Sequence, residues 1–372
     1  MKYIWQCDLW PKLTWNSDTL LSLLGRARLT QGNLLGRVRR LGFSLGEEAR
    51  ADILTEEAIK TAAIEGERLN PQMVRSSVAR HLGLREAGLI SVIRPVDGLV
   101  EVILDATQKY DEPLSADRLK GWHAALFPSG YSGFHKIRVG RWRGKESMRV
   151  VSGPVGKEKV HFEAPPGKDV ESEMRQFLRW WESSRKAADG MLRAGLAHFY
   201  FVTIHPFEDG NGRIARALTD MALAQDENVN IRYYSLSSQI MEERNGYYDI
   251  LEKCSKGDSL DVTKWLVWFL ESFERAIRRS DKIIGNVLAK ADFWQEHAQT
   301  ELNERQRKVL NRMLDAGRGG FVGWLTTRKY VSMTKTSRAT AFREISDMID
   351  KRALRQLPGK GRSVHYDLIW PK

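Results

Sequence analysis

The chain has 372 residues, of which 42% are hydrophobic and 28% charged, and its formal net charge is +12. This composition excludes wholesale disorder and collagen-like repeats. No run of about 18 apolar residues is present, which excludes a transmembrane helix, and the N-terminus lacks the pattern of a secretory signal. We therefore expect a cytoplasmic protein with no membrane partner. Two cysteines far apart in the sequence can form neither a disulfide framework nor a cysteine zinc site.

The first 127 residues are predicted to be largely helical. Residues 20–24 place leucines at helical spacing, and three tryptophans precede them in a segment to which the sequence assigns no role. Residues 47–66 are rich in helix formers and end at Gly66, a favourable residue just beyond a helix end. Residues 97–127 again show an apolar stripe with the period of a helix.

Residues 130–167 differ in character, because glycine, proline and β-branched residues dominate there. Two short β-type runs, Val150–Ser152 and Lys159–Phe162, predict a hairpin. Helical patterns then resume over residues 169–183, 190–204, 212–226, 244–256 and 261–280. The chain is thus predicted to be mainly helical, with one hairpin inserted before a central pair of helices.

The last fifth of the chain is strongly basic. Residues 301–372 hold 16 lysines or arginines and 7 aspartates or glutamates, which gives +9 of the total +12. Three helical segments precede two β-type segments joined by a basic turn, 358–362. This is the order of a winged helix-turn-helix, with 335–349 as the recognition helix. The charge favours an anionic partner, with DNA first, while a merely solvated basic surface or a protein-docking module stays open as an alternative.

Residues 205–216, HPFEDGNGRIAR, gather the groups that phosphoryl or nucleotidyl transfer needs. Two glycines lead into a predicted helix N-terminus, where backbone N–H groups bind anions. Arg213 and Arg216 lie three residues apart, on one face of that helix. Asp209 is placed to hold a Mg²⁺ that bridges phosphates. His205 is placed at the rim as a general base.

These residues match, without gap or substitution, the signature H-x-F-x-[D/E]-G-N-G-R-x-x-R of the Fic family. Residues 244–251, RNGYYDIL, resemble the R-x-x-Y-Y-x-x-L helix of the same family, and the hairpin around 150–162 resembles its flap. The resemblance covers about residues 100–280. It implies a helical core that transfers AMP from ATP, with Mg²⁺, to a Ser, Thr or Tyr hydroxyl of a protein target, itself included.

The resemblance also implies roles for individual residues. His205 would be the base, Phe207 would anchor the loop in the core, and Asp209 would bind Mg²⁺. The implied nucleotide-binding residues are Gly210, Asn211, Gly212, Arg213, Arg216 and Tyr247, together with Val151, Ser152 and Gly153 in the flap. Of these, Gly210–Gly212 would form an anion hole, Arg216 would hold the γ-phosphate, and Tyr247 would lie near the adenine.

A second motif lies N-terminal to this region. Residues 61–66, TAAIEG, fit the pattern [S/T]-x-x-x-E-[G/N] of the inhibitory helix that one Fic subclass carries. Glu65 is then expected to pair with Arg216 and keep it from the γ-phosphate. A capped surface helix that simply ends at Gly66 is the plain alternative.

We therefore predict a mainly α protein in three parts: an N-terminal helical extension with the inhibitory helix (1–75), a Fic core with its flap (76–285), and a winged-helix-like domain (300–372). The predicted function is that of an autoinhibited protein adenylyltransferase. A DNA-binding regulator whose Fic core only senses a nucleotide stays open, as does a Fic enzyme that removes AMP. A homodimer is a candidate assembly.

Overall fold

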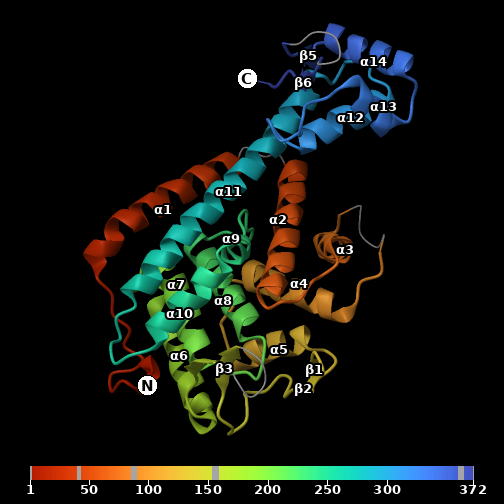
Figure 1. The fold of residues 1–372 in the computed structure, drawn as a ribbon. Helices are drawn as coiled ribbons and strands as arrows, with labels where there is room; N and C mark the ends of the chain where they lie inside the picture. Colours follow the sequence, from red (N-terminus) through yellow and green to blue (C-terminus); the bar gives the residue numbers. More distant parts are fainter. Residues whose placement is uncertain (1, 40–42, 85–89, 153–158, 359–363, 372) are drawn as a thin grey trace. The chain divides into compact units, whose positions relative to one another are not determined.

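The computed structural model describes residues 2–39, 43–84, 90–152, 159–358 and 364–371. The chain divides into two compact units, residues 1–40 with 47–280 and residues 41–46 with 281–372. Each unit is mainly helical, in agreement with the predicted fold class, and the described strands form three two-stranded antiparallel sheets (Figure 1). Across the described ranges, no helix is both long enough and apolar enough to cross a membrane.

The first unit opens with a short 3-10 turn, η1 (Ile4–Gln6), and helix α1 (Ser17–Val38). Helix α2 (Phe43–Ile64) follows and contains the first four residues of the motif expected to be inhibitory, 61–66. After α2 the chain turns sharply, because Gly66 has a left-handed backbone with φ of 87°. Glu65 therefore lies in the turn that follows α2.

The helix predicted over 97–127 is two helices in the structure, α4 (Arg94–Gln108) and α5 (Ala116–Leu126), preceded by α3 (Pro71–Leu82). The prediction of one continuous helix was wrong because Pro113 breaks the pattern and Ser115 starts a new helix. The Ser115 hydroxyl accepts the backbone N–H of Arg118 at 3.1 Å, which is an N-cap.

Two hairpins follow α5. The first pairs β1 (Tyr131–Ser132) with β2 (His135–Lys136). The second is the predicted flap, in which β3 (Arg149–Ser152) pairs with β4 (Lys159–Glu163) around a bulge between Val150 and Val151. The tip of the flap, with the predicted nucleotide contact Gly153, lies outside the described residues.

The core of the first unit is built on the helix pair α7 (Gly190–Ile204) and α8 (Asn211–Glu227), which lie side by side (Figure 1). Helix α7 is apolar on nearly all sides, and almost all of its side chains are buried, as expected for such a helix. The surrounding elements are η2 (Gly167–Asp169), α6 (Val170–Ser184), α9 (Leu236–Glu242), α10 (Arg244–Ser255) and α11 (Thr263–Glu296). The short loop between α7 and α8 carries the motif HPFEDG.

The second unit contains the last part of α11, then α12 (Glu304–Asp315), α13 (Thr327–Thr334), α14 (Arg338–Asp350), β5 (Leu354–Gln356) and β6 (Tyr366–Leu368). Its own apolar core includes Val309, Leu310, Met313, Tyr330, Ile345 and Leu368. Helix α13 runs directly into a turn at Lys335, whose φ is 53°, and α14 follows. Three helices and a hairpin follow the predicted order, and the winged-helix assignment stays a prediction.

Candidate active site

His205 ends helix α7 in a left-handed backbone conformation, with φ of 53° and ψ of 57°. Its Nδ1 lies 3.2 Å from the carbonyl oxygen of Val202. When Nδ1–H donates to this carbonyl, Nε2 keeps the lone pair of a base. Burial lowers the pKa of His205 to about 4, so the imidazole is neutral at physiological pH.

The loop that follows His205 is held by an arginine that the sequence reasoning missed. The Arg143 guanidinium donates from Nε to the carbonyl of His205 at 2.8 Å and also binds the carbonyl of Pro165. The backbone N–H of Arg143 donates to the carbonyl of Pro206 at 2.8 Å. Arg143 lies more than 60 positions earlier in the chain, outside any motif, so only the folded structure reveals it.

Phe207 is fully buried, and its ring stacks on His123 with centroids 4.2 Å apart. Both sides of the Asn211 amide bind the backbone of Phe207: its oxygen accepts from N–H at 3.0 Å, and its nitrogen donates to the carbonyl at 2.8 Å. The Asn211 side chain therefore braces the loop.

Helix α8 starts immediately after Gly210, which has a left-handed φ of 78°. The first N–H groups of a helix have no acceptor within it, so the start of α8 offers donors to an anion. A Cβ atom at Gly212 would lie 2.2 Å from Oε1 of Glu65. The Glu65 carboxylate thus lies directly against the helix start where a phosphate would bind.

Asp209 is half-buried and borders the same space. Its carboxylate accepts the N–H of Gly210 at 2.6 Å and the hydroxyl of Ser132, on strand β1. A single carboxylate beside a phosphate site is a donor set that suits Mg²⁺, which is usually bound by one or two carboxylates together with phosphates. Ser132 had no signal in the sequence, because a lone serine in a hairpin is common.

Both arginines of the motif are buried, and both are paired with carboxylates from the end of α2. Nη2 of Arg216 lies 2.7 Å from Oε1 of Glu65, and its Nε donates to the Thr61 hydroxyl at 2.6 Å. Nη1 of Arg213 lies 3.1 Å from Oε1 of Glu67. Sequence reasoning missed Glu67 because the inhibitory pattern stops one residue before it.

Each of these guanidiniums keeps one buried N–H group, Nε of Arg213 and Nη1 of Arg216, that has no hydrogen-bond partner among the described residues. Burial disfavours the charged form of Arg216, but the Glu65 carboxylate more than offsets this and raises its pKa. Two buried cations with spare donors are therefore held beside the start of α8.

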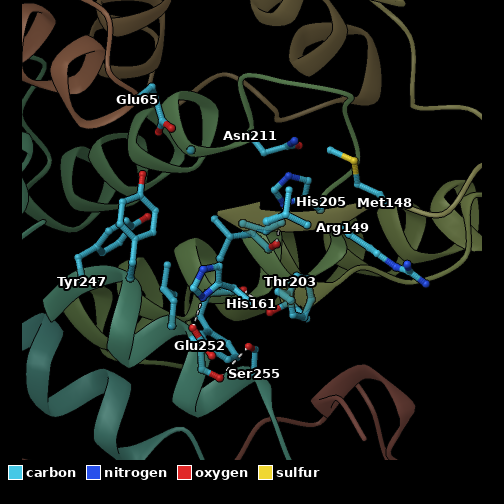
Figure 2. A pocket seen from close by; sticks show the side chains of 18 of the residues that line it. Glu65, Met148, Arg149, His161, Thr203, His205, Asn211, Tyr247, Glu252 and Ser255 are labelled. Carbon is cyan, nitrogen blue, oxygen red and sulfur yellow. Dashed lines mark hydrogen bonds and ion pairs between the residues drawn. The ribbon is translucent and has the colours of Figure 1, made fainter. Parts of the chain in front are cut away.

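A cavity of about 530 Å³ lies between Glu65, His205, Asp209 and the start of α8 (Figure 2). Figure 2 shows Glu65, Asn211 and His205 around one end of it, and His161, Glu252 and Ser255 around the other. The predicted site residues that line the cavity are Glu65, Val151, His205, Asp209, Asn211, Gly212 and Tyr247. Arg213 and Arg216 reach the site from α8 without lining this cavity, Gly210 caps α8, and of Ser152 only the backbone is described.

Tyr247 forms the side wall of the cavity from α10. Its hydroxyl is 2.8 Å from Nε2 of His198, and the other ring nitrogen of His198 is 3.0 Å from the Thr219 hydroxyl. Burial lowers the pKa of His198 to about 3, so this histidine is neutral and serves as a core residue. The two hydrogen bonds of His198 fix the position of the Tyr247 ring.

Residues 113–223 match the Fic/DOC family, and residues 3–84 match a domain of unknown function, DUF4172. The chain contains a Fic/DOC domain. A probable protein adenylyltransferase of Aquifex aeolicus is 28% identical over 178 residues, 45% of this chain and 49% of the relative. A protein adenylyltransferase Fic of Nematostella vectensis is 27% identical over 202 residues, 53% of this chain and 42% of the relative.

The chain therefore spans about half the length of the curated relatives it matches. Among solved structures, a Fic family protein from Desulfovibrio desulfuricans G20 has a TM-score of 0.54 and 16% sequence identity, and the match covers 95% of this chain and 97% of that one. At that identity the likeness concerns the fold. The Fic domain of this chain thus carries the motif loop between α7 and α8 in a helical core of the Fic type.

Proposed function

We propose that the first unit transfers AMP from ATP to a hydroxyl side chain of a protein, its own chain included. The observation that carries the proposal is the common cavity of His205, Asp209 and the start of α8. A neutral imidazole, a carboxylate and a helix N-terminus in one space are what nucleotidyl transfer needs. The names of the curated relatives support the same reaction.

In this reaction, Nε2 of His205 takes the proton of the target hydroxyl while the oxygen of that hydroxyl attacks the α-phosphorus of ATP. The bond from the α-phosphorus to the bridging oxygen breaks, and pyrophosphate leaves with that oxygen. The N–H groups at the start of α8 and the Arg213 guanidinium stabilise the negative charge on the phosphates. Mg²⁺, held by Asp209, would neutralise further phosphate charge when bound.

We further propose that the end of α2 restrains this activity. Glu65 fills the space beside Gly212 and forms an ion pair with the guanidinium of Arg216. The triphosphate needs both that space and that guanidinium. Glu67 forms an ion pair with the guanidinium of the other motif arginine, Arg213. Both carboxylates belong to one turn, so a movement of the end of α2 would release both arginines together.

The proposal is tested by incubating the parent protein and Glu65→Gly with ATP and Mg²⁺ and locating adenylate adducts on hydroxyl side chains by mass spectrometry. Adducts that accumulate faster on the variant support it. The AMP-removing alternative is tested with the adducted protein itself. Release of AMP by the parent but not by Glu65→Gly would assign Glu65 to hydrolysis instead of inhibition.

The pH dependence follows from the pKa of His205. The base must be neutral, and its pKa is lowered to about 4, so the activity is present above that value and lost as the pH falls through it. At saturating ATP and Mg²⁺, the transfer rate of Glu65→Gly should stay nearly constant from about pH 8 to about pH 6 and then fall towards pH 4. A fall that sets in near about 6.5, the pKa of an ordinary histidine, would contradict the buried-base assignment. Circular dichroism over the same range serves as the folding control.

For the second unit we propose DNA binding. Residues 326–343, from α13 into α14, contain five lysines or arginines and no aspartate or glutamate. Lys335, Arg338 and Arg343 are exposed, and Phe342 between them is 59% exposed. The cations can bind DNA phosphates. The exposed apolar side chain between them can contact thymine methyl groups in the major groove.

The 372-residue chain should bind duplex DNA with a Kd that rises at least roughly tenfold between about 50 and 200 mM salt, because several phosphate contacts release counterions. Arg338→Ala combined with Arg343→Ala should weaken binding and reduce the salt dependence. Arg312→Ala, an exposed arginine on α12, is the matched control. Binding that is absent at low salt, or unaffected by the double substitution, would favour a protein-docking role for this unit.

A further inference from the structure

The flap hairpin needs support from outside itself. Strand β3 has four residues and β4 has five, and a bulge interrupts their pairing. A hairpin of two strands is at best marginally stable in water unless one face packs on something else. Since Val151 lines the cavity, the position of this hairpin sets one wall of the active site.

The support comes from the first residues of the chain. The ring of Tyr3 meets Phe162 of β4 edge-on, with centroids 5.3 Å apart. The indole Nε1 of Trp5 donates to the carbonyl of Glu163 at 2.7 Å. Tyr3, Phe162 and Ala164 form a small buried cluster, against which Trp5, Met148 and Val150 pack. One face of the flap is thus covered by a segment that begins about 160 residues earlier.

The same segment is fastened to α10. Tyr3 forms an antiparallel bridge with Lys256, and the N–H of Gly257 donates to the carbonyl of Lys2 at 2.9 Å. Lys256 in turn binds Glu252, which also binds His161 of β4. Burial opposes ionisation of Glu252, but the hydrogen bonds from Lys256 and His161 more than offset it and lower its pKa to about 2. The N-terminal segment, α10 and β4 therefore form a closed ring of contacts.

A second anchor holds the segment farther along. The indole Nε1 of Trp10 donates to a carboxylate oxygen of Glu173 on α6 at 2.9 Å, and its ring meets Tyr200 edge-on at 5.2 Å. The segment is therefore attached to the rigid core at Trp10 and to α10 at Tyr3. A short segment that is attached at both of these points can hold the flap in one position.

We infer that residues 3–5 are a positioning element for the flap, and that they hold it as a wall of the cavity. Val150 and Phe162, which pack in the cluster around Tyr3, also line the cavity together with Val151, so the contact with Tyr3 bears directly on this wall of the site. Val151 and Val160, paired across the strands, are 47% and 37% exposed. The inference rests on the proposed transfer, because the positioned wall is where the acceptor hydroxyl approaches His205.

The test compares Tyr3→Ala/Trp5→Ala with the parent, both in a Glu65→Gly background. Without ATP, amide hydrogen exchange in 149–152 and 159–163 should speed up by about tenfold, which corresponds to the loss of one aromatic contact and one hydrogen bond. Exchange in α7 and α8 should not change. With ATP, the self-modification rate at saturating ATP should fall by a similar factor, with little change in the apparent KM for ATP, because the phosphates bind at α8.

Tyr3→Phe keeps the edge-on contact and should behave like the parent. Leu9→Ala is the control within the same segment, since Leu9 is 63% exposed and outside the cluster. Unchanged exchange in β3 and β4 of the double variant would overturn the inference. Faster exchange throughout α7 and α8 would also overturn it, because residues 3–5 would then stabilise the whole fold rather than position the flap. Failure of Glu65→Gly itself to acquire AMP would overturn the proposed transfer, whereas the exchange result, obtained without ATP, would still decide the role of Tyr3.

Discussion

His205→Ala is expected to lower the rate of AMP transfer by roughly 10²- to 10⁴-fold, the usual contribution of a general base. The reason is geometric. Nδ1 of His205 is 3.2 Å from the Val202 carbonyl, so Nε2 is the nitrogen left to accept a proton, and the lowered pKa keeps it available. Among the described residues that line the cavity, the other imidazole is His161, which is bound to Glu252.

The variant is best measured in a Glu65→Gly background, where transfer is not restrained. ATP affinity should stay within about threefold of the parent, because the phosphate donors belong to α8 and to Arg213 and Arg216 rather than to the imidazole. His81→Ala, which removes an exposed histidine on α3 outside the cavity, should leave the rate unchanged. A His205→Ala protein that modifies itself at nearly the parent rate would remove His205 from the role of base.

Glu65→Gly is expected to raise self-modification by up to about 100-fold. Glu65 lies against Gly212 and pairs with Arg216 at 2.7 Å, so ATP that binds beside it must place its phosphates elsewhere. A displacement of a reacting group by about 1 Å can cost roughly 100-fold in rate. Inhibition therefore does not require that ATP be excluded. The gain should appear in the rate at saturating ATP as well as in the apparent KM.

Other substitutions at the end of α2 should give graded results. Glu67→Ala should raise activity by a few-fold at most, since Glu67 is half exposed and exposed ion pairs are worth about 0–1 kcal/mol. Glu56→Ala removes an ion pair to Arg279 from the same helix and should have no effect. Arg216→Ala should not reproduce the gain, because in the proposed reaction Arg216 also holds the triphosphate. A Glu65→Gly protein no more active than the parent at any ATP concentration would contradict the inhibitory role.

The sequence predicted most accurately what is contiguous in the chain. The motif loop, the two helices around it and the flap strands are short-range features, and the helix 190–204 was placed with the bounds of α7. The end of α2, two residues before Gly66, was also predictable, because a glycine after a run of helix formers marks a helix end. The break between α4 and α5 was missed because the apolar period continues on both sides of it.

What the sequence did not reveal are partners that tertiary structure brings from elsewhere. Arg143 under the His205 carbonyl, Ser132 on Asp209 and Glu67 on Arg213 are common residue types with no local pattern. The contacts of the N-terminal tryptophans were missed for the same reason. Their contacts with β4 and α6 span more than 150 residues, and no periodicity within the segment indicates them.

The most direct test of the proposed chemistry uses Glu65→Gly with Mg²⁺ and ATP labelled either at the α-phosphate or at the γ-phosphate. Transfer of AMP through attack on the α-phosphorus predicts that only the α label enters the protein, that the γ label appears in free pyrophosphate, and that His205→Ala abolishes the α signal. Incorporation of the γ label, or no incorporation of either label by a protein that binds ATP, would contradict adenylyl transfer at this site.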